Sequence, residues 1–167
     1  PHDIALHSIR PVTDEAHARF SATSRTYRYY VTLRKDPFQE SRMLRLHFPL
    51  DFERMNEAAQ RLMDYEDFTS FSKLHTDVKT NNCRVLEAYW QRGSEEGTWI
   101  FTITADRFLR NMVRAIVGTL FAVGKSRLSV EDFAAIIEAK DRSLAGASAP
   151  AHALYLEAVG YPEELYL

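Results

Sequence analysis

Residues 83–105 read Cys-Arg-Val-Leu-Glu-Ala-Tyr-Trp-Gln-Arg-Gly-Ser-Glu-Glu-Gly-Thr-Trp-Ile-Phe-Thr-Ile-Thr-Ala. The two ends of this stretch, residues 83–91 and 98–105, are rich in apolar, aromatic and β-branched residues, which is typical of strands. The polar segment between them, residues 92–97, contains glycines and charged residues and predicts a turn. We therefore expect an antiparallel hairpin, whose second strand carries on one face Trp99, Phe101 and Ile103.

Downstream of the hairpin, the pattern predicts two helices and a short strand. Residues 107–123 have mostly apolar positions at helical spacing, and Gly124 provides a stop signal. Ser129, with Asp132 three residues later, predicts the start of the next helix. A final apolar run at residues 154–159 predicts the last strand.

Upstream of the hairpin, the pattern predicts one strand and one helix. Residues 25–34 alternate in polarity, as expected for a half-buried strand. Asp51 is a suitable N-terminal cap for a helix that ends before Asp67. The face of the strand expected to be buried carries Tyr27, Tyr29, Val31 and Leu33.

The predicted elements favour an α+β fold in which an antiparallel-rich mixed sheet is covered by helices on one face. The chain has 167 residues, of which 46% are hydrophobic and 26% charged, so one substantial core and a single domain over residues 1–167 are expected. The uncovered face of such a sheet is suited to RNA or a partner domain, although it also occurs with a purely structural role.

The charge is uneven along the chain. The formal net charge of −2 argues against binding nucleic acid through bulk positive charge. Residues 16–35 nevertheless contain five cationic residues and no acid: Arg19, Arg25, Arg28, Arg34 and Lys35. A local surface for an anionic partner therefore remains possible.

Three arginines stand out in the first helix after the hairpin. Arg107, Arg110 and Arg114 follow one another at spacings of three and four, which would place them along one side of an otherwise apolar helix. Arginine is suited to forked pairing with a carboxylate or a phosphate, so an anionic partner is expected. The alternative is an ordinary solvated stripe on an amphipathic helix.

Other signals are few. The single cysteine, Cys83, predicts a packed thiol in a reducing cytoplasm, and no apolar run is long enough to cross a membrane. No histidine pair has the spacing of a metal site on one helix, and we do not expect His75, Asp77 and His152 to form one. The chain begins with Pro1, which fits either a fragment of a longer protein or removal of an initiating methionine.

Several motifs together resemble the C-terminal half of the tRNA pseudouridine synthase A (TruA) family. They occur in the family's order over nearly the whole chain: His17-Ala-Arg-Phe-Ser-Ala22, Arg25-Thr-Tyr-Arg-Tyr29, Asp67-Phe-Thr-Ser-Phe71, Phe108-Leu-Arg-Asn-Met-Val-Arg114-Ala-Ile-Val-Gly118 and Ala153-Leu-Tyr-Leu156. In the last of them, Ala153 replaces a glycine that is common in the family. If that glycine allows a close approach or a positive φ, alanine would shift the following strand.

The resemblance implies an isomerase that converts uridine to pseudouridine at positions 38–40 in the anticodon arm of tRNA. The family uses no metal and no organic cofactor, and its members are homodimers. Its catalytic aspartate lies in a Gly-Arg-Thr-Asp-Ala-Gly-Val-His-Ala-like motif upstream of this chain's first residue, and no aspartate here has that setting. The resemblance therefore implies that the chain alone is inactive.

The resemblance also assigns roles to individual residues. Arg114 matches the arginine that pairs with the catalytic aspartate, Tyr27 the tyrosine that packs on the target base, and Leu154 an apolar residue of the base pocket. Ordinary core packing is the alternative role for Tyr27. Arg19 and Arg110 are the expected phosphate contacts, and Arg107 is expected to be solvated.

Two other classes of function are compatible with the sequence. One is a non-catalytic RNA-binding module that uses the uncovered face of the sheet. The other is a dimerisation domain that associates through an apolar helix surface formed by Ile116, Leu120 and Phe121. An upstream half with a catalytic aspartate would favour the synthase over both.

Overall fold

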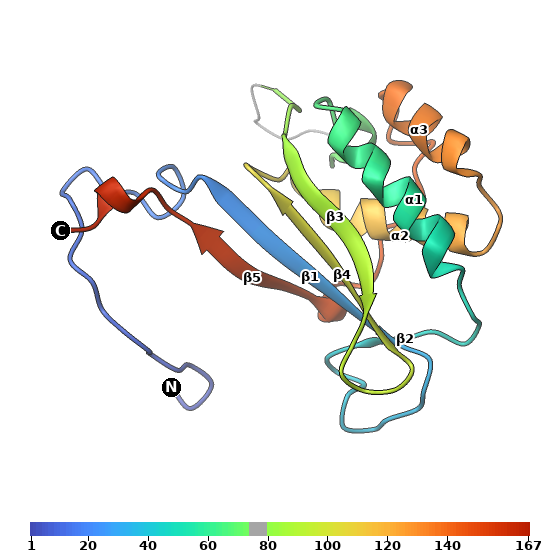
Figure 1. Cartoon of the computed structure of the whole chain (residues 1–167), viewed down its shortest axis with the longest axis horizontal. Helices are drawn as coiled ribbons and strands as arrows, with labels where there is room; N and C mark the ends of the chain where they lie inside the picture. Colours follow the sequence, from blue (N-terminus) through green and yellow to red (C-terminus); the bar gives the residue numbers. More distant parts are fainter. Residues whose placement is uncertain (74–79) are drawn as a thin grey trace.

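The computed structural model describes residues 1–73 and 80–167 and contains a five-stranded sheet and three α-helices (Figure 1). The strands are β1 (Ser24–Thr32), β2 (Leu44–Arg45), β3 (Val85–Arg92), β4 (Thr98–Ala105) and β5 (Leu154–Gly160). The helices are α1 (Phe52–Gln60), α2 (Met112–Gly124) and α3 (Val130–Glu138).

The sheet is mixed but mostly antiparallel. Its strand order is β2-β1-β4-β3, and β5 pairs with β1 along the edge that also holds β2. The predicted hairpin is confirmed as β3 and β4, with Tyr89 opposite Thr102. Only the pair of β1 and β2 is parallel, and β2 was not predicted because two residues are too few to show a period.

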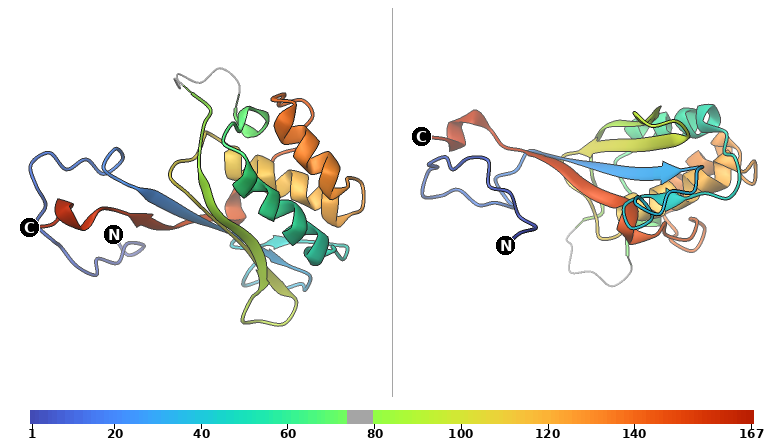
Figure 2. Two further views of the ribbon diagram at one scale, coloured as in Figure 1. Left: turned by 45° about the horizontal axis from the view of Figure 1, so that its top comes forward. Right: turned by 90° about the horizontal axis from the view of Figure 1, so that it is seen from below.

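All three helices lie on one face of the sheet, as expected (Figure 2). The side chains of Tyr29, Val31 and Phe101 point to that face and are fully buried in the core. Tyr30 alternates with Tyr29 and Val31 along β1, so its side chain points to the opposite face of the sheet. The α+β fold class is therefore confirmed.

The predicted N-terminal caps are also present. The Asp51 side chain accepts a hydrogen bond from the backbone N–H of Arg54, and Ser129 and Asp132 form a reciprocal capping box. Gly124 ends α2, but it does so without a positive φ. A Cβ atom at this position would lie 2.4 Å from Sδ of Met55, so the glycine permits close packing of α2 on α1.

The predicted helical row of three arginines is wrong. Asn111 has a left-handed backbone with φ of 69°, and α2 begins only at Met112. Asparagine tolerates this conformation better than most residues, so it allows the chain to turn sharply into the helix. Arg107 and Arg110 therefore lie in the loop before α2, and only Arg114 belongs to the helix.

The apolar helix surface considered for dimerisation is likewise absent. Ile116 and Leu120 are fully buried, and only Phe121 is partly exposed. Helix α2 packs on α1 and α3, and its Phe121 ring contacts Tyr29 and Trp90 of the sheet. The hydrophobic residues of α2 are therefore not available to a second copy.

The Asp67 carboxylate stabilises the turn after α1. It accepts hydrogen bonds from the hydroxyl and the backbone N–H of Thr69, and it pairs with Lys140 at 3.0 Å. The hydrogen bond from the Thr69 hydroxyl is the main reason why the pKa of Asp67 lies below its usual value. Because this folded-state pKa is depressed, the stabilisation is complete above the unfolded pKa and is lost as the pH falls through the folded one.

We expect Asp67→Asn to lower the free energy of unfolding by about 1 kcal/mol at pH 7. The difference from wild type should be smaller at pH 3 than at pH 7, because this stabilisation is lost as the pH falls through the folded-state pKa. Urea unfolding at both pH values measures it, with Asp64→Asn as a control because Asp64 accepts no side-chain hydrogen bond from a described residue. A loss of equal size at both pH values would contradict this role of the charge.

Candidate active site

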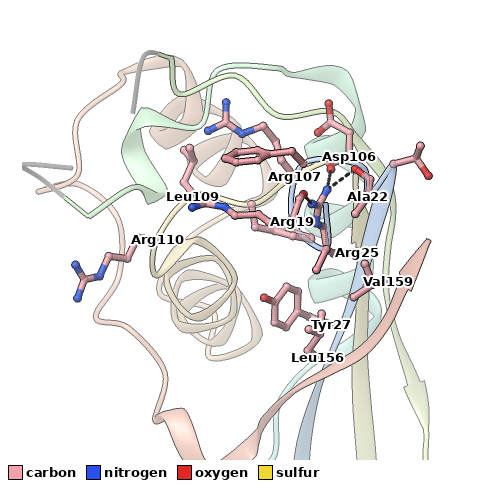
Figure 3. Close-up of a pocket in the computed structure, with 14 residues that line it drawn as sticks. Arg19, Ala22, Arg25, Tyr27, Asp106, Arg107, Leu109, Arg110, Leu156 and Val159 are labelled. Atoms are coloured by element: carbon pink, nitrogen blue, oxygen red, sulfur yellow. Dashed lines mark hydrogen bonds between the residues drawn. The ribbon is translucent and has the colours of Figure 1, made fainter. Parts of the chain in front are cut away.

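A cleft of about 1130 Å³ opens where the start of β1, the end of β4 and β5 meet (Figure 3). One wall is the loop before β1, and the opposite wall is the segment between β4 and α2. The lining residues are Ala18, Arg19, Phe20, Ala22, Thr23, Arg25, Tyr27, Asp106, Arg107, Phe108, Leu109, Arg110, Leu156 and Val159.

The lining is strongly cationic. It contains four arginines and one carboxylate, Asp106. The Oδ1 atom of Asp106 accepts a hydrogen bond from the backbone N–H of Arg84 at 2.8 Å. This carboxylate is therefore bonded to the residue that directly precedes β3. A cleft with this surplus of positive charge attracts an anionic ligand even though the whole chain is slightly acidic.

Arg19 and Arg110 both line the cleft, Arg19 from the loop before β1 and Arg110 from the segment before α2. Figure 3 shows the Arg110 guanidinium directed away from Arg25 and Tyr27. Arg19 and Arg110 are both exposed, and neither side chain donates a hydrogen bond to a residue that the structure describes. Arg107 differs from them, because it is half-buried and donates long hydrogen bonds to the carbonyl oxygens of Thr80 and Asn82. Arg107 thus supports a wall of the cleft and is not simply solvated.

Tyr27 provides a flat apolar surface inside the cleft (Figure 3). Its ring meets the ring of Phe108 edge-on with 5.1 Å between centroids, and its register partner in β5 is Leu156. Tyr27 is half-buried, whereas the neighbouring Tyr29 is fully buried in the core. The tyrosine is therefore held by packing and still presents part of its surface to a ligand.

Arg114 lies on the first turn of α2 and is half-buried, and it is not one of the residues that line the cleft. Its Nε donates to the carbonyl oxygen of Ala149 at 2.6 Å. Burial raises the pKa of the Tyr29 hydroxyl, and the positive charge of Arg114 partly offsets this increase. The two Nη atoms donate no hydrogen bond to any described residue, so they remain available to a carboxylate.

Leu154 is not in the cleft lining. It pairs with Tyr29 at the start of β5 and packs partly against the core, whereas Leu156, two residues further, lines the cleft beside Tyr27. Ala153 is fully buried and its backbone is not left-handed, so alanine there causes no strain of the kind considered above. The motif thus offers two apolar residues, Leu156 in the cleft and Leu154 packed against the core.

Three further residues of the cleft were not singled out from the sequence. Phe108 and Leu156 meet Tyr27 only through the pairing of β1 with β5 and the course of the loop before α2. Arg25 was noted only as part of a cationic segment, yet its guanidinium bonds to three backbone carbonyls around the cleft. All three residues stand in the motifs that resemble the family, but nothing in the sequence assigned a role in the site to any of them.

The remaining expectations concern metals, the thiol and membranes. His75 and Asp77 lie outside the described residues, and the rest of the chain contains no group of three or more His, Cys, Asp or Glu that could hold a metal ion. Cys83 is buried, and desolvation raises the pKa of its thiol to about 11, as expected for a packed thiol. In residues 1–73 and 80–167, every helix is too short or too polar to span a bilayer.

Comparison with known proteins gives a consistent result. The family model described as tRNA pseudouridine synthase matches residues 58–162. The chain is 65% identical over 167 residues to tRNA pseudouridine synthase A of Porphyromonas gingivalis, with all of this chain and 66% of the relative covered. It is 58% identical over 166 residues to the protein of that name from Bacteroides fragilis, with 99% and 66% covered.

A more distant relative gives the same coverage. The chain is 40% identical over 163 residues to tRNA pseudouridine synthase A of Bacillus subtilis, with 96% of this chain and 65% of the relative covered. The chain thus spans just under two thirds of the length of the curated relatives it matches. The family match and the high identities together establish that this chain belongs to the tRNA pseudouridine synthase family.

Proposed function

We propose that the chain is the C-terminal half of an enzyme that isomerises uridine to pseudouridine at positions 38–40 in the anticodon arm of tRNA. The observation that carries the proposal is the cationic cleft with Tyr27 inside it, in a chain that belongs to this family and whose Arg114 donates no Nη hydrogen bond to a described residue. The part of the protein beyond this chain supplies the catalytic aspartate. The reaction needs no metal or organic cofactor.

The isomerisation replaces one bond to the ribose by another. The aspartate forms a covalent bond to the nucleoside, and the bond between the ribose and the uracil nitrogen breaks. Uracil then turns and rejoins the ribose through a carbon, and the bond to the aspartate is broken again, which returns the free carboxylate. The uracil carbon loses its proton, and the freed nitrogen gains one, so no other reactant is consumed. During these reaction steps, Arg114 pairs with the aspartate through its Nη atoms and keeps the carboxylate ionised and oriented.

Tyr27 receives the target base. A uridine taken out of its stack loses contact with the neighbouring bases, and an aromatic ring replaces part of that contact. The ring of Tyr27 is held edge-on by Phe108, so it offers its face without having to be ordered on binding. Leu156, the register partner of Tyr27, supplies the apolar side of the base pocket in place of Leu154, which lies outside the cleft lining.

We expect Tyr27→Ala to lower kcat/KM for tRNA by about tenfold or more, because base–aromatic stacking contributes roughly 1–3 kcal/mol. Tyr27→Phe should keep most of the activity, since the ring is retained. Release of label from tRNA with tritiated uridine measures the rate. Tyr30→Ala is the matched control, because Tyr30 lies on the opposite face of β1. A Tyr27→Ala protein that is folded and fully active would exclude this role.

Arg19 and Arg110 bind phosphates of the anticodon arm. Both side chains belong to exposed residues of the cleft and donate no hydrogen bond to a described residue, although the Arg19 guanidinium lies over the ring of Phe20. Such side chains suit phosphate contacts, which set the position of the RNA without reading its sequence. A second copy of the protein completes the functional dimer. The reaction takes place in the cytoplasm, where tRNA is modified.

Binding of tRNA by the protein that carries this chain should weaken steeply as salt rises. Arg19→Ala and Arg110→Ala should each reduce the slope of log K against log salt by about 1. Filter binding at a series of salt concentrations gives the slope, and Arg54→Ala is a control because Arg54 bonds to Ser126 away from the cleft. An unchanged slope in both cleft variants would contradict the phosphate assignment.

The proposal itself is tested by the product. The protein that carries this chain is incubated with tRNA transcripts in which uridine occurs at position 38, 39 or 40, and pseudouridine is mapped by chemical modification and primer extension. We expect modification at these positions and nowhere else in the transcript. Binding of tRNA without any pseudouridine would favour a non-catalytic RNA-binding module.

A further inference from the structure

The wall of the cleft that carries Arg19 is a tight turn, residues 17–22, which bonds mainly to itself and to its neighbours. The backbone N–H of Ser21 donates to the carbonyl oxygen of His17 at 2.9 Å, and Oγ of Ser21 accepts from the N–H of His17 at 3.0 Å. No helix or strand contains this segment. Its shape therefore depends on side chains that bond to its backbone.

His17 holds the middle of the turn. Its Nδ1 atom accepts hydrogen bonds from the backbone N–H groups of Arg19 at 3.1 Å and Phe20 at 3.2 Å. A side-chain acceptor two and three residues before the donors is the arrangement with which Asn and Asp close similar turns. The imidazole ring also packs on the ring of Phe20, with 4.4 Å between centroids.

Arg25 holds the turn from the other side (Figure 3). Its Nη1 atom donates to the carbonyl oxygens of Ala22 at 2.9 Å and Asp106 at 2.7 Å, and its Nη2 atom donates to the carbonyl oxygen of Arg19. One half-buried guanidinium thus joins the turn to the end of β4, which leads into the opposite wall. Its donors are directed at backbone, which leaves little of its charge to a ligand.

Two more contacts fix the turn against the end of β5. The hydroxyl of Tyr161 donates a hydrogen bond to the carbonyl oxygen of Ala18 at 2.6 Å. The backbone N–H of Thr23 donates one to the carbonyl oxygen of Gly160 at 2.9 Å. The Arg19 backbone is therefore held at its N–H by His17 and at its carbonyl by Arg25. Its side chain alone is left to meet a ligand.

We infer that His17 and Arg25 are positioning residues that fix the turn so that the Arg19 guanidinium faces an RNA phosphate before the RNA arrives. A cation on a loop loses conformational freedom when it binds, and a turn that is already ordered reduces this cost. The inference rests on the proposed function for its ligand. The order of the turn itself does not depend on that function.

Two variants of His17 separate the acceptor from the ring. His17→Phe keeps the packing on Phe20 and removes the acceptor, whereas His17→Asn loses the ring and places Oδ1 where Nδ1 was. Arg25→Lys removes the forked contact with the three carbonyls. Arg28→Lys is the matched control, because Arg28 on the same strand pairs with Glu157 outside the cleft.

The experiment uses the protein that carries this chain, with tRNA transcript as the ligand. We expect His17→Phe and Arg25→Lys to raise KM for tRNA by about tenfold with kcat unchanged, since the loss of a few hydrogen bonds has effects of this order. Trypsin cleavage after Arg19, followed by mass spectrometry without RNA, should become faster in the same variants. His17→Asn should restore both values to within about twofold of wild type.

The two readouts distinguish the possible failures. Unchanged cleavage and unchanged KM in His17→Phe and Arg25→Lys would refute the inference. Faster cleavage with an unchanged KM would also refute it, because the turn would then be loosened without any effect on a ligand contact. Failure of His17→Asn to rescue His17→Phe would refute the role of the acceptor. A wild-type protein that binds no tRNA while the cleavage results hold would refute the proposed function and leave the ordered turn established.

Discussion

Replacement of Arg114 by alanine should reduce pseudouridine formation by about a hundredfold or more while tRNA binding stays within a few-fold of wild type. Removing a preorganised charge from a reaction centre has an effect of this size. The Nε atom of Arg114 donates to the carbonyl oxygen of Ala149, and its Nη atoms have no hydrogen-bond partner among the described residues. The guanidinium is therefore fixed at one end and retains free donors at the other. On the proposed function, the variant removes the ion pair that keeps the catalytic aspartate oriented.

Arg114→Lys provides the sharper comparison. Lysine keeps the positive charge but cannot both bond to Ala149 and present a fork to the carboxylate, so we expect only partial recovery of kcat. Single-turnover rates with saturating protein separate the chemical step from binding. Arg127→Ala on the loop after α2 serves as a control for loss of a charge. Near-full activity of Arg114→Ala would remove this residue from the active site.

Gly118→Ala should cause the largest loss of stability, of several kcal/mol, because overpacking against rigid backbone has no local remedy. A Cβ atom on Gly118 would lie 1.8 Å from the carbonyl oxygen of Ala147. The segment around Ala147 cannot easily retreat, since the backbone N–H of Ala149 donates to the carbonyl of Arg114 and Ser148 accepts from Asn111 at 2.6 Å.

The same substitution should also lower activity, because the segment that must move carries the carbonyl that orients Arg114. Urea unfolding measures the stability, and Gly160→Ala is a suitable control. A Cβ atom there would meet only the side chains of Thr23 and Ser24, which can rotate, so its loss should be much smaller. Equal stability of Gly118→Ala and wild type would mean that the close approach of α2 to this segment is not required.

The parts of the fold that the sequence predicted are those decided by neighbouring residues. The hairpin follows from two strand-like runs around a polar turn, and the caps at Asp51 and Ser129 follow from side chains within three residues of the bonds they accept. The motifs also identified the family, which the comparisons confirm.

The parts that were not predicted depend on distant contacts or on a single backbone conformation. The left-handed Asn111 breaks the expected helix and separates Arg110 from Arg114, and no period in the sequence reveals it. The three carbonyls around Arg25 and the ring of Phe108 against Tyr27 come together only when β1, β4 and β5 pair. The roles of the site residues, taken from the resemblance, remain predictions.

The most direct test compares the 167-residue chain with the longer protein that contains it and the aspartate-bearing part. Both are assayed for pseudouridine in the same tRNA transcript at equal concentration. We predict that the longer protein forms pseudouridine at positions 38–40 and that the chain alone forms none, because the carboxylate that pairs with Arg114 is absent. Turnover by the chain alone would contradict the conclusion that it holds only half of the active site.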